Sequence, residues 1–120
     1  MPRRRAVPFA VAATAVAISL PAAADARTYH GYVTGSGTIT LENSAGNRVS
    51  RIPAGSHVFR IHDLTSSHNF VLRRRTNVLF ATTVSGTGVR SWTRRIRAGR
   101  TYRYECTPHR TVMYGTFRGI

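Results

Sequence analysis

The residues best suited to chemistry lie near the end of the chain, in a stretch that carries a thiol, an imidazole and a thioether. Cys106, His109 and Met113 follow one another with the spacing Cys-x2-His-x3-Met. Thiolate, imidazole and thioether are the soft and borderline ligands that suit copper. The stretch therefore predicts most of a copper site on one loop between two strands.

The remaining ligand has to come from another part of the chain. A trigonal copper site with a weak axial methionine uses two histidines and one cysteine, and His68 is the best second histidine. It shares its alternation with Phe70 and Leu72, so we expect it to face the core. The same argument turns Cys106 and Met113 inward. Three candidate ligands would then meet at one pole of a β-sandwich.

Cys106 is the single cysteine of the chain. A small exported domain usually carries an even number of cysteines in disulfides. A free thiol in an oxidising compartment is vulnerable unless something occupies it. Taken alone, a cysteine is most often a small buried hydrophobe. The combination with His68, His109 and Met113 favours a metal ligand instead.

The N-terminal segment has the order of a secretory signal peptide. Three arginines precede the apolar run Val7–Leu20, and small residues follow it. Cleavage after Ala24 and after Ala26 both fit, and the arginines leave twin-arginine export open. The run is shorter than the roughly 20 apolar residues of a spanning helix, which disfavours an uncleaved anchor. We expect a signal peptide over residues 1–26 and one domain over residues 27–120.

The chain is strongly basic. It has 18 basic residues against 4 acidic ones, a formal net charge of +14, and every basic residue is arginine. This charge favours acidic partners or surfaces, with an attraction that weakens in salt. The export signal and the lack of an interleaved aromatic and basic motif argue against a nucleic-acid partner.

Short β-rich runs alternate with turn signals from residue 27 onward, which predicts an all-β sandwich or barrel. Apolar and charged residues alternate in Phe59–His62 and Tyr102–Glu105, as in strands with one buried face. We expect Arg74–Gly88 to be a connection. The expected strands are Tyr29–Val33, Gly37–Glu42, Arg48–Ile52, Val58–Leu64, Asn69–Arg73, Val89–Ile96, Thr101–Cys106 and Tyr114–Arg118.

A few polar residues fit this pattern less well. Arg94 shares the parity of Trp92 and Ile96, where an apolar residue would be expected, and Arg73–Arg75 is a basic cluster at a strand end. We interpret these arginines as edge or surface residues whose stems cover apolar area. The histidines without a partner pattern are expected at the surface or in turns. They are His30, His57 and His62.

A His-Asn-Phe triplet, a Cys-Thr-Pro-His loop and the runs around them resemble a known family. The segments are His68–Phe70, Cys106–Met113, Asp63–Leu72, Ser91–Ile96 and Tyr102–Phe117. In these segments the chain is similar to the cupredoxins, close to their plastocyanin and amicyanin branch. The resemblance covers nearly all of residues 27–120. It implies a Greek-key β-sandwich or barrel of about seven or eight strands with one copper ion.

The resemblance also implies a role for each residue of the site. His68 and His109 would bind copper through a ring nitrogen. Cys106 would supply the thiolate, with Met113 in the axial position. Asn69 would hold the two ligand segments together through hydrogen bonds that orient the ligands. Four protein ligands leave no open position of the kind that catalytic metals keep, so we do not expect an enzyme.

Pro108 bears on the reduction potential of such a site. It lies between Cys106 and His109 and has no N–H. It therefore cannot donate a hydrogen bond to the thiolate sulfur. Because fewer such bonds favour the oxidised state, we expect a lower potential than with a donor at this position.

Two functions are compatible with these features. One is a monomeric, soluble one-electron carrier that cycles between Cu(I) and Cu(II), is periplasmic or secreted, and docks with an acidic redox partner. The other is a copper-binding protein that stores, senses or delivers the metal. The basic charge does not decide between them. A third possibility is a docking module with incidental metal. If Cys106→Ser left copper binding and the role in the cell intact, the predicted site would be wrong.

Overall fold

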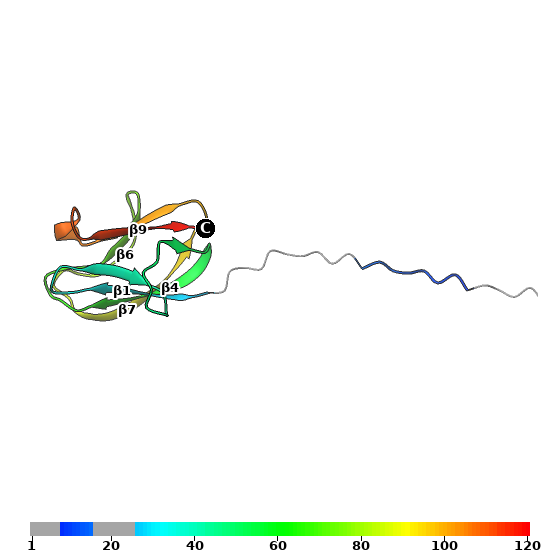
Figure 1. Ribbon diagram of the computed structural model, residues 1–120, viewed down its shortest axis with the longest axis horizontal. Helices are drawn as coiled ribbons and strands as arrows, with labels where there is room; N and C mark the ends of the chain where they lie inside the picture. Colours follow the sequence, from blue (N-terminus) through cyan, green and yellow to red (C-terminus); the bar gives the residue numbers. More distant parts are fainter. Residues whose placement is uncertain (1–7, 16–25) are drawn as a thin grey trace, which may run out of the picture.

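The chain folds into two β-sheets packed face to face, as Figure 1 shows. The computed structural model describes residues 8–15 and 26–120. The expected signal segment falls largely outside these residues, and its removal stays a prediction. Residues 8–15 are exposed and form no regular secondary structure. In the part of the chain described, no helix has the length and apolarity needed to cross a membrane.

The strands of the two sheets come from alternating parts of the sequence. They are β1 (Thr28–Val33), β2 (Ile39–Glu42), β3 (Arg51–Ile52), β4 (Gly55–Asp63), β5 (Val71–Arg74), β6 (Asn77–Ala81), β7 (Gly88–Ile96), β8 (Thr101–Glu105) and β9 (Tyr114–Gly119). One sheet has the order β2-β1-β4-β7 and the other the order β3-β9-β8-β5-β6. The pairs β1–β4 and β3–β9 are parallel, and the rest are antiparallel. This architecture confirms the predicted all-β sandwich.

The core lies between the sheets and follows the predicted alternation. In β4, Phe59 is buried and Arg60 is exposed, and in β8 both Tyr102 and Tyr104 are buried. The rings of Phe59 and Phe117 meet across the core, with centroids 6.4 Å apart. Each fully buried ring of this size contributes roughly 1.5–3 kcal/mol. The packed sheets therefore fix the positions at which the loops at their ends begin and end.

The segment Arg74–Gly88, which we expected to be a connection without a strand, contains β6. The prediction for this segment was wrong. The chain turns at Arg75, with φ of 54°, and returns as β6 beside β5. The register shifts within this pair, and burial along Asn77–Ala81 does not alternate. That irregularity hid the strand from a search for period two. Phe80 is the buried residue of β6, and its ring lies parallel to that of Trp92 at 4.5 Å.

Arg94 joins the open edges of the two sheets. It is half-buried in β7, and its Nε donates to the carbonyl oxygen of Leu79 in β6 at 2.7 Å. Because β7 and β6 end their respective sheets, this bond spans the sandwich at its side. The expected edge position of Arg94 is thus confirmed, and its guanidinium has a specific partner.

His57 lies in the core, so its expected surface position is wrong. It is completely buried in β4, on the same parity as Phe59. Its Nε2 donates to the carbonyl oxygen of Pro53 at 2.6 Å, and its Nδ1 accepts from the backbone N–H of Arg27 at 3.1 Å. A buried imidazole is tolerated when both nitrogens are paired. This pairing also holds the start of β1 in place.

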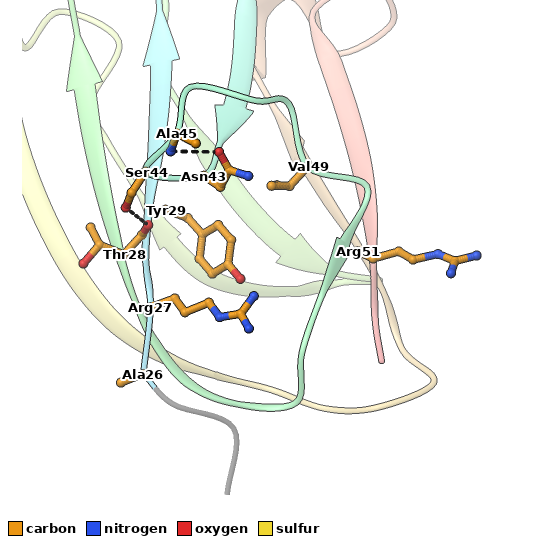
Figure 2. Close-up of a pocket in the computed structure, with 9 residues that line it drawn as sticks. All are labelled: Ala26, Arg27, Thr28, Tyr29, Asn43, Ser44, Ala45, Val49 and Arg51. Atoms are coloured by element: carbon orange, nitrogen blue, oxygen red, sulfur yellow. Dashed lines mark hydrogen bonds between the residues drawn. The ribbon is translucent and has the colours of Figure 1, made fainter.

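The two poles of the sandwich differ. The short 3₁₀ helix η1 (Thr107–His109) lies at one pole, and the start of β1 and the end of β9 lie at the other (Figure 1). A cavity of 480 Å³ opens at the second pole, where Tyr29 lies between Arg27 and Asn43 (Figure 2). The predicted ligands lie at the first pole, so this cavity is not part of the predicted metal site.

Candidate metal centre

Three of the four predicted ligands converge at the pole that carries η1. The Nδ1 atoms of His68 and His109 lie 3.1 Å apart. The Sγ atom of Cys106 lies 3.6 Å from the first nitrogen and 3.8 Å from the second. With bonds of about 2.0–2.3 Å, two ligands of one ion lie roughly 3–4 Å apart. One metal ion therefore fits between the three donor atoms.

Neighbouring strand ends bring these residues together. Cys106 directly follows β8 and is completely buried. His68 is half-buried in the loop before β5, and β5 pairs with β8. His109 ends η1 and is exposed. The buried position predicted for Cys106 is confirmed. The strand after His68 begins at Val71 rather than at the expected Asn69.

Met113 closes the loop that begins at Cys106. The backbone N–H of Cys106 donates to the carbonyl oxygen of Met113 at 3.0 Å, and that of Met113 donates to His109 at 2.8 Å. Only 4% of Met113 is exposed. Its Sδ would lie 3.8 Å from a Cβ built on Gly37, in the turn between β1 and β2. The thioether is thus held at this pole, and its axial ligation remains a prediction.

Asn69 connects the two ligand segments, in the manner that the resemblance implies. Its Oδ1 accepts from the backbone N–H of Thr107 at 2.7 Å, and its Nδ2 donates to Thr107 Oγ1 at 3.0 Å. The same amide donates to the carbonyl oxygen of Thr82 at 3.3 Å. Asn69 is only 5% exposed, so these bonds have little competition from water. They hold the segment of His68 against the segment of Cys106.

The core beneath Asn69 is closely packed. Phe70 is completely buried and stacks on Tyr104, with ring centroids 5.4 Å apart and an interplanar angle of 5°. A Cβ on Gly31 would lie 2.8 Å from the Phe70 ring and 2.5 Å from Ile61. Only glycine permits this approach of β1 to the opposite sheet. Phe70 therefore anchors the end of the loop that carries His68 and Asn69.

A buried ion pair lies next to the cluster, and the sequence did not predict it. The Glu105 side chain is 4% exposed, and its carboxylate contacts Arg73 Nε at 2.5 Å and Arg103 Nε at 3.5 Å. Arg103 also lies over the ring of Tyr114, 4.1 Å from its centroid. A buried carboxylate requires such partners. Arg73 is therefore a structural partner of Glu105 rather than a solvated edge residue.

The sulfur of Cys106 has few polar neighbours. Between residues 26 and 120, its hydrogen-bond contacts are the rings of His68 and His109. Pro108 stands at the beginning of η1, where another residue would present an N–H. The effect of this position on the potential stays a prediction.

The chemistry of the donor set fits copper. Two imidazole nitrogens and one cysteine sulfur lie around a common point, and a thioether is held at the same pole. Soft sulfur ligands together with imidazole select copper over the hard cations. The residues present therefore suit a single type 1 copper ion.

The fold is cupredoxin-like, and comparisons with solved structures agree on it. Rusticyanin from Thiobacillus ferrooxidans has a TM-score of 0.56 at 19% identity, covering 80% of this chain and 79% of that one. Auracyanin from Roseiflexus castenholzii has a TM-score of 0.55 at 17% identity, covering 79% and 98%. Auracyanin A, a "blue" copper protein from Chloroflexus aurantiacus, has 0.57 at 13%, covering 80% and 100%. No protein-family model and no curated protein matches the sequence.

These likenesses confirm the predicted cupredoxin-like fold. At 20% identity or below they concern the fold alone, so the chemistry of the site is argued from its own residues.

Two further histidines contact each other, which the sequence did not reveal. His30 in β1 and His62 in β4 lie on the outer face of the four-stranded sheet, and both are half-buried. His30 Nδ1 lies 3.2 Å from His62 Nε2. The surface position expected for His30 and His62 is confirmed. The expectation that neither has a partner is wrong, because each is the partner of the other. Alternation placed each histidine on an outer face without indicating that β1 and β4 are neighbours.

Proposed function

We propose that the protein is an exported type 1 copper protein that carries one electron at a time. The observation behind this proposal is the convergence of His68, Cys106 and His109 within 4.8 Å, with Met113 buried at the same pole. Bound copper would supply a Cu(I)/Cu(II) couple. We propose His68 and His109 as nitrogen ligands, Cys106 as the thiolate and Met113 as the axial ligand.

The scaffold of the site supports rapid electron exchange. Asn69 joins both ligand segments, and the loop from Cys106 to Met113 is closed by backbone hydrogen bonds. A site that is held in one geometry changes little between oxidation states, so little reorganisation opposes electron movement. This rigidity favours a carrier.

His109 offers the electron a route to the surface. Cys106 is completely buried, whereas His109 is exposed, with exposed Pro108 and Val112 close to it in the same loop. An apolar surface around an exposed ligand edge allows a partner to approach without desolvating charges. We propose this surface as the point where electrons enter and leave.

We further propose that the redox partner has an acidic surface and that the protein acts as a monomer. Residues 27–120 hold fifteen arginines against three acidic residues, which supports an acidic partner, and Arg110 is exposed within the loop of the site. Electrostatic attraction of this kind raises association rates and is screened by salt. The rate of electron exchange with an acidic partner should therefore fall as ionic strength rises.

The proposed cell compartment is the periplasm or the outside of the cell. The support is the basic, apolar and small-residue order of the N-terminal segment. We propose that the protein is not an enzyme, because four protein ligands would leave no open coordination position.

Copper storage, sensing or delivery is the second candidate function. The exposed His109 favours it, because a metal acceptor could displace this ligand first. The deciding experiment records visible and electron-spin-resonance spectra of the copper-loaded protein, then adds a competing chelator. An intense thiolate-to-copper band with fast, reversible electron exchange and retained copper supports the carrier. A colourless protein whose copper passes readily to the chelator contradicts the carrier and supports delivery.

A further inference from the structure

The outer face of the four-stranded sheet carries a pair of histidines in contact with each other. Parallel pairing of β1 and β4 places His30 opposite Arg60 and Tyr32 opposite His62. His30 and His62 are therefore diagonal neighbours on one face, a distance that ring side chains can bridge. Both rings are half-buried, so they are partly ordered by packing and still open to solvent.

The two ring nitrogens have the separation of two ligands of one metal ion. His30 Nδ1 and His62 Nε2 lie 3.2 Å apart. Two metal–nitrogen bonds of about 2.0–2.1 Å, at angles between 90° and the tetrahedral value, place the nitrogens about 2.9–3.4 Å apart. The pair in the first site has almost the same separation, 3.1 Å. The separation of the second pair is therefore compatible with a shared metal ion, which would replace the hydrogen bond between the two rings.

Neighbouring side chains hold one ring in place, and the same face carries a carboxylate. Tyr32 stacks on His62, with ring centroids 4.6 Å apart and an interplanar angle of 11°. Glu42 in β2 stands directly opposite His30 and projects from the same face. Within the part of the chain described, no ion pair engages Glu42. It is available to balance the charge of a cation.

The charge around the pair determines how tightly it can hold a cation. Arg60 stands directly opposite His30 on the paired strand. Arg60 opposes a bound cation, so the site is a weak and exchangeable one.

We propose that His30 and His62 form a second metal site, which binds one divalent ion such as Zn²⁺ or Cu²⁺ through two ring nitrogens, while Glu42 on the same face balances its charge without being a third ligand. Imidazole nitrogen and carboxylate oxygen suit divalent ions of borderline softness. No thiolate or thioether is present on this face, so Cu(I) is not favoured. The site is separate from the Cys106 cluster in residues, in sheet face and in ligand chemistry.

The test is a Zn²⁺ titration of the purified protein loaded with Cu(I), followed by two-dimensional NMR of the histidine rings. Both Cu(I) and Zn²⁺ are diamagnetic, so each of the five imidazoles can be followed. We expect saturable shifts of the His30 and His62 rings together, with His57 unchanged. His30→Asn and His62→Asn should each abolish the saturable shift, and Arg60→Ala should lower the Zn²⁺ concentration at half saturation.

Ser91→Ala is the matched control. Ser91 lies opposite Arg60 on the same face and is exposed, but it offers no ring nitrogen. It should bind Zn²⁺ like the unmodified protein. Unchanged thermal unfolding of the Asn variants excludes a loss of fold, and a variant that melts early is replaced by His30→Gln or His62→Gln.

The proposal is overturned if Zn²⁺ causes no saturable shift at His30 and His62, or if the shift persists in both Asn variants. Its failure is distinct from failure of the proposed function. If the Cys106 cluster takes up no copper but His30 and His62 still respond to Zn²⁺, the electron carrier is excluded and the second site stands.

Discussion

The two histidine pairs of this molecule have nearly the same separation and very different surroundings. His68 and His109 lie 3.1 Å apart beside the buried thiol of Cys106, at the end of the sandwich. His30 and His62 lie 3.2 Å apart on the outer face of one sheet, beside the ring of Tyr32 and on strands next to that of Glu42. The separation of two imidazoles creates room for a metal. The third and fourth donors then decide which metal and which oxidation state the site favours.

The pairs also differ in what holds them. Loops carry His68 and His109, and Asn69 ties those loops together through side-chain hydrogen bonds. Strand register alone brings His30 and His62 together, because β1 and β4 are paired along their length. The first pair therefore depends on a few polar contacts, whereas the second depends on the sheet as a whole.

Replacing Cys106 by Ser should have the largest effect. It removes the thiolate and leaves His68 and His109 with nitrogen and oxygen donors, as at the pair of His30 and His62. We expect copper affinity to fall by roughly a hundredfold or more, beyond the loss seen for outer-shell partners. The intense visible band should disappear, and residual Cu²⁺ should give the resonance spectrum of an ordinary nitrogen and oxygen site. Chelator competition and electron-spin resonance measure both effects. A retained visible band would contradict the proposed ligand set.

Replacing Asn69 by Ala should weaken only the first pair. Loss of its three hydrogen bonds frees the loops, so copper affinity should fall roughly 10–100-fold. The free energy of unfolding should fall by about 1–3 kcal/mol, because buried partners lose their bonds. Zn²⁺ binding by His30 and His62 should not change. Asn77→Ala, exposed in β6, is the control, and equal losses in both variants would refute the role of Asn69.

Replacing Pro108 by Ala should alter the potential and leave copper bound. The new N–H can donate to the Cys106 sulfur and stabilise the reduced state, so the potential should rise by roughly 60 mV, which is about 1.4 kcal/mol for one electron. Cyclic voltammetry of the copper-loaded protein measures the shift. Thr111→Ala, exposed in the same loop, serves as the control. A potential unchanged in Pro108→Ala would show that this position does not tune the site.

The smallest effect concerns the pH response of the second pair. The pKa of His62 lies below 6.5 because of burial, His30 and Arg60. Between the lowered value and 6.5 the unfolded chain binds more protons than the folded one, so the metal-free protein should lose stability as pH falls through this range. NMR titration should show the pKa of His62 rising in Arg60→Ala. His62→Asn should flatten the decline in denaturant unfolding, and an unchanged decline would assign it to another group.

The sequence was sufficient for the fold class and for the place of the first site. Alternation in Phe59–His62 and Tyr102–Tyr104 showed which residues face the core. The spacing from Cys106 to Met113 put two sulfur groups and an imidazole on one loop. These local signals located the site correctly because β5 pairs with β8. That pairing brings His68, which precedes β5, next to Cys106, which follows β8. The ligand roles themselves stay predictions until copper is measured.

The rest depended on contacts that alternation does not encode. β6 was missed because its register shifts and its burial is irregular. His57 was placed at the surface because its partners, Pro53 and the backbone of Arg27, offer no side-chain signal. The pair of His30 and His62 requires parallel pairing of strands 32 residues apart at that point. Periodicity gives the face of a strand, but not its neighbour.

The bond from Arg94 to the carbonyl oxygen of Leu79 has a consequence for self-association. β6 ends its sheet, and an unpaired edge invites a strand from another molecule to add to it. Leu79 lies at the register shift of β6, and its carbonyl is occupied by the guanidinium of Arg94. A bulged edge with a bound carbonyl and a cation beside it is a poor template for a further strand. Arg94 thereby protects this edge from the first step of aggregation.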